Sequence, residues 1–212
     1  MIICMSDVIC VTNRTLCKGD FLSRIEAIAG NNPAAIILRE KDLTEEEYRA
    51  LARQVMTICE RHQVPCILHY HKKVAEQLKA SALQVPLPVL REMTTRERKQ
   101  FRMLGASCHS VSEAMEAAAL GCTYLVAGHI FATDCKIGLE PRGLSFLTEV
   151  CRNVQIPVYA IGGINSENIR LVKEAGAKGG CIMSGLMTCD HPAEYIKEME
   201  FLDENSTDNR RQ

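Results

Sequence analysis

The sequence predicts a single-domain α/β fold, a (β/α)8 TIM barrel, on three observations. Eight short apolar runs recur along the 212 residues, and a segment with helical signals follows each run. The two kinds of segment alternate with a period of about 25 residues, which favours a parallel sheet with helical crossovers. An open doubly wound sheet is the alternative, but the GxGxxG fingerprint of a dinucleotide-binding sheet is absent after the first run.

The eight apolar runs are the expected strands. They are DVICVT (7–12), AAIILR (34–39), PCILHY (65–70), SALQVPL (81–87), MLGASC (103–108), CTYLVAG (122–128), IPVYAIG (156–162) and KGGCIMS (178–184). The fourth is the weakest strand candidate because Pro86 cannot donate a ladder hydrogen bond. No linker divides the chain, so we expect one catalytic barrel domain over residues 1–202. Residues 203–212 lack apolar anchors and are expected to form a disordered tail.

Helix boundaries also carry sequence signals. A capping box, in which Ser or Thr precedes Glu by three residues, marks three helix starts. The boxes are Thr44 with Glu47, Thr94 with Glu97, and Ser110 with Glu113. Asn165 or Ser166 is expected to cap the segment ENIRLVKEA, and glycines at 121 and 176 are expected to end helices.

Composition narrows the function classes. The chain carries 25 Lys and Arg against 26 Asp and Glu, a formal net charge of −1. This balance argues against a nucleic-acid partner and against a polybasic membrane patch. Eleven cysteines, several within apolar runs and none in a CxxC pair, indicate reduced thiols and a cytoplasmic protein.

Two glycine turns indicate a phosphate site. In a barrel the active site lies at the carboxyl ends of the strands, and the loops after the seventh and eighth strands often bind phosphate. We therefore expect these two loops to form a phosphate cup. Its residues are Gly162, Gly163, Ile164, Met183, Ser184 and Gly185. Alternatively, the glycines only permit tight turns.

Four of the six histidines fall on the same rim: His69, His71, His109 and His129. His69 and His71 resemble a metal pair, but no third ligand accompanies them and two lysines follow, so no metal is expected. His129, in the segment GHIFATDCK (128–136), is the candidate general acid and base, because imidazole titrates near neutral pH. The alternative is a histidine that is merely hydrogen-bonded within a rim loop.

The sequence resembles the thiamin phosphate synthase superfamily over roughly residues 8–190. The resemblance rests on VTNR (11–14), LREKDL (38–43), LGASCHS (104–110), VAGHIFATDCKIG (126–138), IPVYAIGGINSENI (156–169) and GGCIMSGLM (179–187). The family includes a magnesium-dependent synthase, which joins a pyrimidine methyl pyrophosphate to a thiazole phosphate. It also includes a TenI-type tautomerase, which aromatises a thiazole carboxylate phosphate.

Departures from the synthase pattern favour the tautomerase. The resemblance places Asn-Asp-Arg after the third synthase strand, where this chain has His69, Tyr70 and His71. The metal-binding aspartate after the fourth strand has no equivalent in PLPVLRE, and His129 replaces a proline. Because Mg²⁺ needs hard oxygen ligands, these changes predict the loss of tight metal and pyrophosphate binding.

We therefore expect a thiazole tautomerase of thiamin biosynthesis, an isomerase that needs no cofactor and shifts protons through His129. The expected substrate-binding residues are Arg39, Lys41, Ser107, Thr133 and Lys136. The expected partner is a small thiazole phosphate, with no nucleic acid and no membrane, and homo-oligomerisation is open. The alternatives are a thiamin phosphate synthase and a non-catalytic regulator that binds a phosphate ligand.

Overall fold

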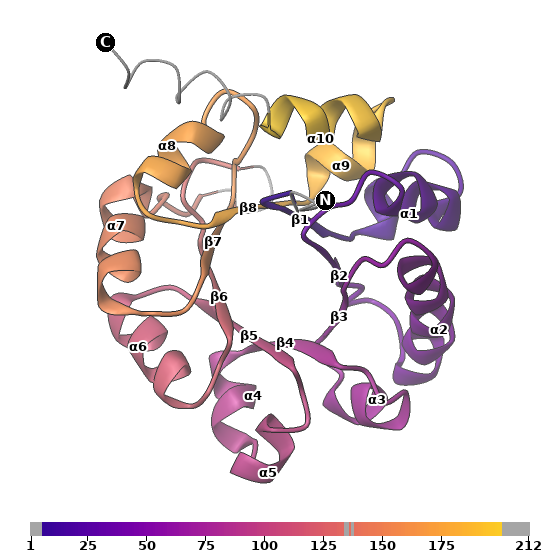
Figure 1. Ribbon diagram of the computed structural model, residues 1–212, viewed down its shortest axis with the longest axis horizontal. Helices are drawn as coiled ribbons and strands as arrows, with labels where there is room; N and C mark the ends of the chain where they lie inside the picture. The colour runs from indigo at the N-terminus through magenta and orange to yellow at the C-terminus, as the bar shows by residue number, and fades with distance from the viewer. Residues whose placement is uncertain (1–5, 134–135, 137, 201–212) are drawn as a thin grey trace, which may run out of the picture.

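A computed structural model describes residues 6–133, 136 and 138–200, and it forms a closed parallel barrel. The strands follow one another around the ring in chain order, and β8 pairs with β1 to close it. Figure 1 shows the helices outside this ring. The predicted (β/α)8 barrel is confirmed, and the closure excludes the open sheet. The predicted tail, 203–212, lies outside the described residues.

All eight strands fall within the predicted runs. They are β1 Val8–Val11, β2 Ala35–Leu38, β3 Cys66–His69, β4 Ala82–Pro86, β5 Met103–Cys108, β6 Tyr124–Gly128, β7 Val158–Ile161 and β8 Gly179–Ile182. The helices are η1 Arg14–Leu16, α1 Phe21–Ala29, α2 Glu45–Arg61, α3 Lys72–Gln77, α4 Leu87–Glu92, α5 Thr95–Arg98, α6 Val111–Ala119, α7 Gly143–Asn153, α8 Ile169–Glu174, α9 Ser184–Thr188 and α10 Pro192–Glu200. Among these, no helix is long and apolar enough to cross a bilayer.

Strand side chains divide the core into two layers. Successive residues of a strand point to opposite faces of the sheet, so Ile9 and Val11 fill the barrel while Val8 and Cys10 pack against the helices. The inner layer consists of Ile9, Val11, Ala35, Ile37, Ile67, Ala82, Tyr124, Val126 and Cys181. Because this layer is packed with side chains, ligands are restricted to the ends of the barrel.

Two of the three predicted capping boxes are complete. Thr44 and Thr94 each accept a hydrogen bond from the amide three residues later, and the Glu at that position bonds back. Ser110 caps α6, but Glu113 accepts from the amide of His109 instead. The predicted cap of α8 is wrong, because α8 begins only at Ile169.

The polar residues before α8 close a loop rather than cap a helix. Asn168 donates its Nδ2 to the carbonyl of Gly163 at 2.8 Å and accepts the amide of Asn165 at 3.0 Å. These bonds fix the glycine turn after β7. The side chains of Asn165 and Asn168 therefore form hydrogen bonds within the loop.

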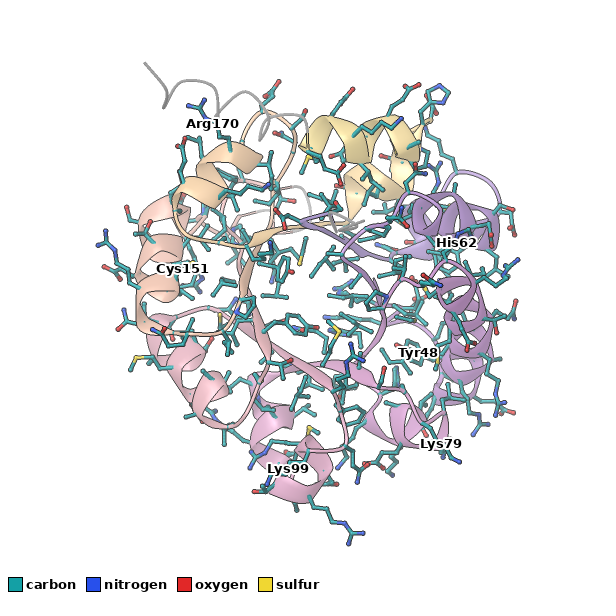
Figure 2. All side chains as sticks on the ribbon, in the orientation of Figure 1. Tyr48, His62, Lys79, Lys99, Cys151 and Arg170 are labelled. Carbon is teal, nitrogen blue, oxygen red and sulfur yellow. The ribbon has the colours of Figure 1, made fainter. Side chains whose placement is uncertain are left out.

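Tyr48 ties the carboxyl ends of β2 and β3 together. This residue of α2 is fully buried, between its helix and the strands (Figure 2). Its hydroxyl donates to the carbonyl of Leu38 at 2.7 Å and accepts from the amide of His69 at 2.9 Å. One side chain thus satisfies a buried acceptor and a donor directly beneath the rim.

We expect Tyr48→Phe to destabilise the protein by about 1–3 kcal/mol, because the Leu38 carbonyl and the His69 amide lose their partner. Urea denaturation followed by circular dichroism measures this change. Tyr70→Phe is the matched control, since Tyr70 is 53% exposed, and should change stability by less than about 0.5 kcal/mol. Equal stabilities of the two variants would contradict this role of Tyr48.

Candidate active site

A cavity of about 630 Å³ opens at the carboxyl ends of the strands. Residues at the ends of all eight strands line it, from Val11 at the end of β1 to Met183 after β8. Its floor includes the apolar side chains of Val11, Val126 and Ile161, while its wall is polar and largely basic. An apolar floor with converging polar groups is typical of a small-molecule site.

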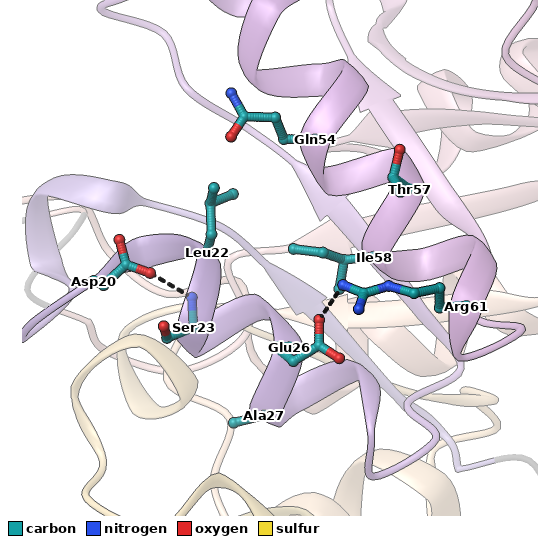
Figure 3. A pocket seen from close by; sticks show the side chains of 9 residues that line it. All are labelled: Asp20, Leu22, Ser23, Glu26, Ala27, Gln54, Thr57, Ile58 and Arg61. Carbon is teal, nitrogen blue, oxygen red and sulfur yellow. Dashed lines mark hydrogen bonds and ion pairs between the residues drawn. The ribbon is translucent and has the colours of Figure 1, made fainter.

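A second depression, of about 670 Å³, lies between α1 and α2 on the outside of the barrel (Figure 3). Its polar groups bond to one another: Arg61 pairs with Glu26 at 2.6 Å, and Asp20 caps α1 through the amide of Ser23 at 2.7 Å. Although it is slightly larger, this groove presents satisfied groups on helix surfaces. The cavity at the barrel mouth is therefore the candidate active site.

The structure brings the predicted site residues together, with one exception. Those that line the cavity are Arg39, Lys41, Ser107, His129, Thr133, Lys136, Gly162, Gly163, Ile164, Met183 and Ser184. Gly185 does not line it. A Cβ at that position would meet the hydroxyl and ring of Tyr195, so this glycine provides room for helix packing.

Glu40 is a site residue that sequence reasoning missed. It is 2% exposed, and its carboxylate accepts from the hydroxyl of Thr12 at 2.6 Å and from the amide of Arg14 at 3.1 and 3.0 Å. The Thr12 hydroxyl in turn accepts from the amide of Arg39 at 2.9 Å. This network joins the loops after β1 and β2. Its sequence signal was an acidic residue between the two cations of LREKD.

Three cations approach one another at the mouth of the cavity. Repulsion by Arg39, partial burial and repulsion by Lys136 lower the pKa of Lys41. Arg39 extends from the end of β2 and Lys136 from the loop after β6. Within the described part of the chain, none of the three forms a salt bridge. Such an arrangement attracts anions.

The imidazoles of His69, at the end of β3, and of His71 remain neutral. Burial, with repulsion from Arg39, Lys41 and His71, lowers the pKa of His69 to about 3. Burial also lowers the pKa of His71, against the effect of Glu45, and the His71 ring lies 4.3 Å from that of Tyr48. At neutral pH both imidazoles therefore offer one N–H donor each and no positive charge.

His129 is 9% exposed and well anchored. Its Nε2 lies 3.3 Å from the carbonyl of Leu139, which requires the proton on Nε2 because a carbonyl only accepts. Its own carbonyl accepts from the amide of Arg142 at 3.0 Å, and the Gly128–His129 peptide bond is cis. Asp134 and Cys135 of the same segment lie outside the described residues.

The two glycine loops present backbone donors. Gly162 and Gly163 have φ angles of +98° and +67°, which only glycine adopts freely. Within the described residues, the amides of Gly163, Ile164 and Ser184 have no hydrogen-bond partner. Converging free amides are suited to phosphate oxygens.

The magnesium of the synthase pattern does not fit the residues present. Across the described ranges, no three His, Cys, Asp or Glu side chains are grouped so that they could hold a metal ion. After β3 the donors are two imidazoles and a phenol, and Pro86 ends β4. Glu40 alone supplies a carboxylate to the described lining, and it is already hydrogen-bonded. Mg²⁺ prefers carboxylates, phosphates and water.

We expect His69 to make stability depend on pH. Its pKa is about 3 in the folded chain and near the ordinary 6.5 when unfolded, so only the unfolded chain takes up this proton between those values. The free energy of unfolding therefore falls as the pH drops from 6.5 toward 3. Relative to His69→Gln, the wild-type protein should lose up to about 2 kcal/mol between pH 7 and pH 5. Parallel stability curves, from urea denaturation at each pH, would contradict a neutral buried imidazole.

A family model and two curated relatives show that this chain is similar in sequence to thiamine-phosphate synthases. The family model described as thiamine monophosphate synthase matches residues 8–186. A thiamine-phosphate synthase from Syntrophomonas wolfei is 32% identical over 184 residues, 84% of this chain and 86% of the relative. Thiamine-phosphate synthase 2 from Streptococcus pneumoniae is 34% identical over 175 residues, 80% of this chain and 81% of the relative.

A solved structure shares the whole fold. It is a thiamine phosphate pyrophosphorylase from Pyrococcus furiosus, with a TM-score of 0.80 and 26% sequence identity, covering 93% of this chain and 95% of its own. The relatives from Syntrophomonas wolfei and Streptococcus pneumoniae are named as synthases, which are transferases, and the solved structure is named as a pyrophosphorylase, so the tautomerase and isomerase prediction is wrong. The chain belongs to the thiamine monophosphate synthase family.

Proposed function

We propose that the chain is a thiamine-phosphate synthase, which joins pyrimidine methyl pyrophosphate to thiazole phosphate and releases pyrophosphate. One observation carries the proposal: a single cavity presents two separate surfaces suited to phosphate groups. The glycine loops after β7 and β8 offer neutral amides. The side formed by the loops after β2 and β6 offers cations. Relatives at 32% and 34% identity that carry the synthase name support the same reaction.

The glycine loops suit the monophosphate of the thiazole. Free amides of Gly163, Ile164 and Ser184 can donate to its oxygens. The missing side chain of Gly163 lets this turn pack against Phe131 and Ala132. A neutral amide cup matches a small phosphate that must later leave with the product. We therefore assign the thiazole substrate to this side of the cavity.

The cationic side suits the pyrophosphate of the pyrimidine substrate. In the reaction, the bond from the methylene carbon to the pyrophosphate oxygen breaks and a bond from the thiazole ring nitrogen to that carbon forms. The electron pair of the broken bond leaves with pyrophosphate, so negative charge accumulates there. Arg39, Lys41 and Lys136 are placed to stabilise that charge.

No proton is transferred in this step, because the thiazole nitrogen attacks through its lone pair. The site therefore needs positioning and charge stabilisation rather than a general base. Ser107 is fixed by the Nε2 of Gln84 at 3.1 Å, and His129 is fixed by its backbone contacts. We assign both to the cavity wall that orients the two rings, and we assign His129 no acid–base role.

The direct test is to incubate the purified protein with pyrimidine methyl pyrophosphate and thiazole phosphate and to measure thiamin phosphate by its oxidation to a fluorescent product. We expect turnover that requires both substrates. Binding of thiazole phosphate with no product, in buffers with and without magnesium, would contradict a synthase and support a ligand-binding regulator.

Gly163→Ala should raise the KM for thiazole phosphate by about tenfold or more, because the loss of one or two charge-assisted bonds costs about 1.5–3 kcal/mol each. A Cβ there would lie 2.5 Å from the carbonyl of Ala132, at a φ of +67°. Gly121→Ala is the matched control, with a φ of +95° and no atom within 4 Å of its Cβ. It should cost about 1 kcal/mol of stability and leave the KM unchanged. Equal KM values for the two variants would remove the β7 loop from the phosphate site.

A further inference from the structure

We propose that this site binds the pyrophosphate group through its own cations and without a divalent metal ion. Arg39 and Lys41 after β2, with Lys136 from the loop after β6, form the diphosphate site, and neutral His69 adjoins them. The identity of the diphosphate substrate rests on the proposed function. The metal-independent binding of a diphosphate is a separate claim that can be measured without turnover.

The first support is the chemistry of the available donors. A magnesium-bridged diphosphate needs at least one carboxylate free to bind the ion. Glu40 accepts hydrogen bonds from the Thr12 hydroxyl and from the Arg14 amide on both of its oxygens. A metal ion would have to compete for these oxygens with the hydrogen bonds that join the loops after β1 and β2. The Glu40 carboxylate instead holds the backbone from which Arg39 and Lys41 extend, through Thr12 and the Arg14 amide.

The second support is the unrelieved repulsion among the cations. Arg39, Lys41 and Lys136 line the same cavity, and both Arg39 and Lys136 lower the pKa of Lys41, which lies within electrostatic reach of both. A polyanion between them would replace this repulsion with attraction and would raise the pKa of Lys41. Diphosphate binding at alkaline pH should therefore be accompanied by proton uptake.

The third support is the nature of the residues after β3. A carboxylate at the position of Tyr70 or His71 would repel a diphosphate unless a metal ion lay between them. The neutral imidazole of His69 exerts no such repulsion and carries an N–H donor. The residues after β3 thus lack metal ligands, while the basic residues after β2 and β6 are retained. A bound diphosphate would therefore contact N–H donors and cations directly.

This arrangement predicts that magnesium lowers the affinity of the site for diphosphate. A diphosphate that carries Mg²⁺ has two fewer negative charges and is attracted less by a cluster of cations. Added magnesium should therefore weaken binding here, whereas it strengthens binding in a site that uses carboxylates and a bridging ion. Because Lys41 and Lys136 are exposed, added NaCl should also weaken binding.

Isothermal titration of the purified protein with inorganic pyrophosphate tests the proposal. We expect saturable binding in EDTA, with severalfold weaker binding in excess MgCl2. Lys41→Gln and Arg39→Gln should each weaken binding in EDTA by roughly tenfold or more, as expected for loss of a charge-assisted contact. Lys99→Gln should bind as the wild type, since Lys99 lies beside α5, away from the cavity (Figure 2).

Binding that appears only with magnesium, or that magnesium tightens, would overturn the proposal. So would wild-type affinity in both Lys41→Gln and Arg39→Gln. The synthase assay separates this failure from failure of the proposed function. Product formed only with magnesium would refute metal independence and retain the synthase. Pyrophosphate binding in EDTA without product in any buffer would retain the diphosphate site and refute the synthase.

Discussion

The pairing of β8 with β1 is the constraint on which the site depends. Closure of the parallel sheet places the carboxyl ends of eight strands around one opening, although the residues concerned are spread from Val11 to Ser184. The packed inner layer then closes the barrel below that opening. A ligand can only sit among the loops at the rim, where chemistry is set by the first residues after each strand.

The rim is supported from below by two buried polar contacts. Tyr48 joins the ends of β2 and β3 through its hydroxyl, and Glu40 joins the loops after β1 and β2 through its carboxylate. Both keep backbone groups satisfied where the strands end. Together they fix the origins of Arg39, Lys41 and His69, so the long cationic side chains extend from a rigid base. The order of the site therefore originates partly in Tyr48, beneath the rim, and partly in Glu40, which lines the cavity.

Much of this architecture is readable from the sequence. Apolar runs and capping boxes located eight strands and the start of α2, because burial and helix capping are local signals. The place of Gly185 outside the cavity lining and the true cap of α8 escape sequence analysis for a common reason. The role of Gly185 depends on Tyr195 from α10, and Asn168 bonds across its loop to Gly163. Such contacts depend on the tertiary structure and leave no periodic pattern.

The function was misjudged for a different reason. Substitutions at the positions of the magnesium ligands predict loss of the whole pyrophosphate side, with His129 as the remaining catalyst. Local departures show which contacts are missing but not which reaction persists, and similarity over most of the chain is to synthases. Buried Glu40 and the mutual repulsion of the cations become visible only in three dimensions. They support the proposal that the pyrophosphate side binds its anion through cations.

A crystal structure of the protein grown with thiazole phosphate, pyrophosphate and magnesium chloride would test this account most directly. It should show the monophosphate on the amides of the loops after β7 and β8, with pyrophosphate against Arg39 and Lys41 and no metal ion bridging it to the protein. An octahedral Mg²⁺ held between pyrophosphate and a carboxylate of this chain, or an empty cationic side, would contradict it.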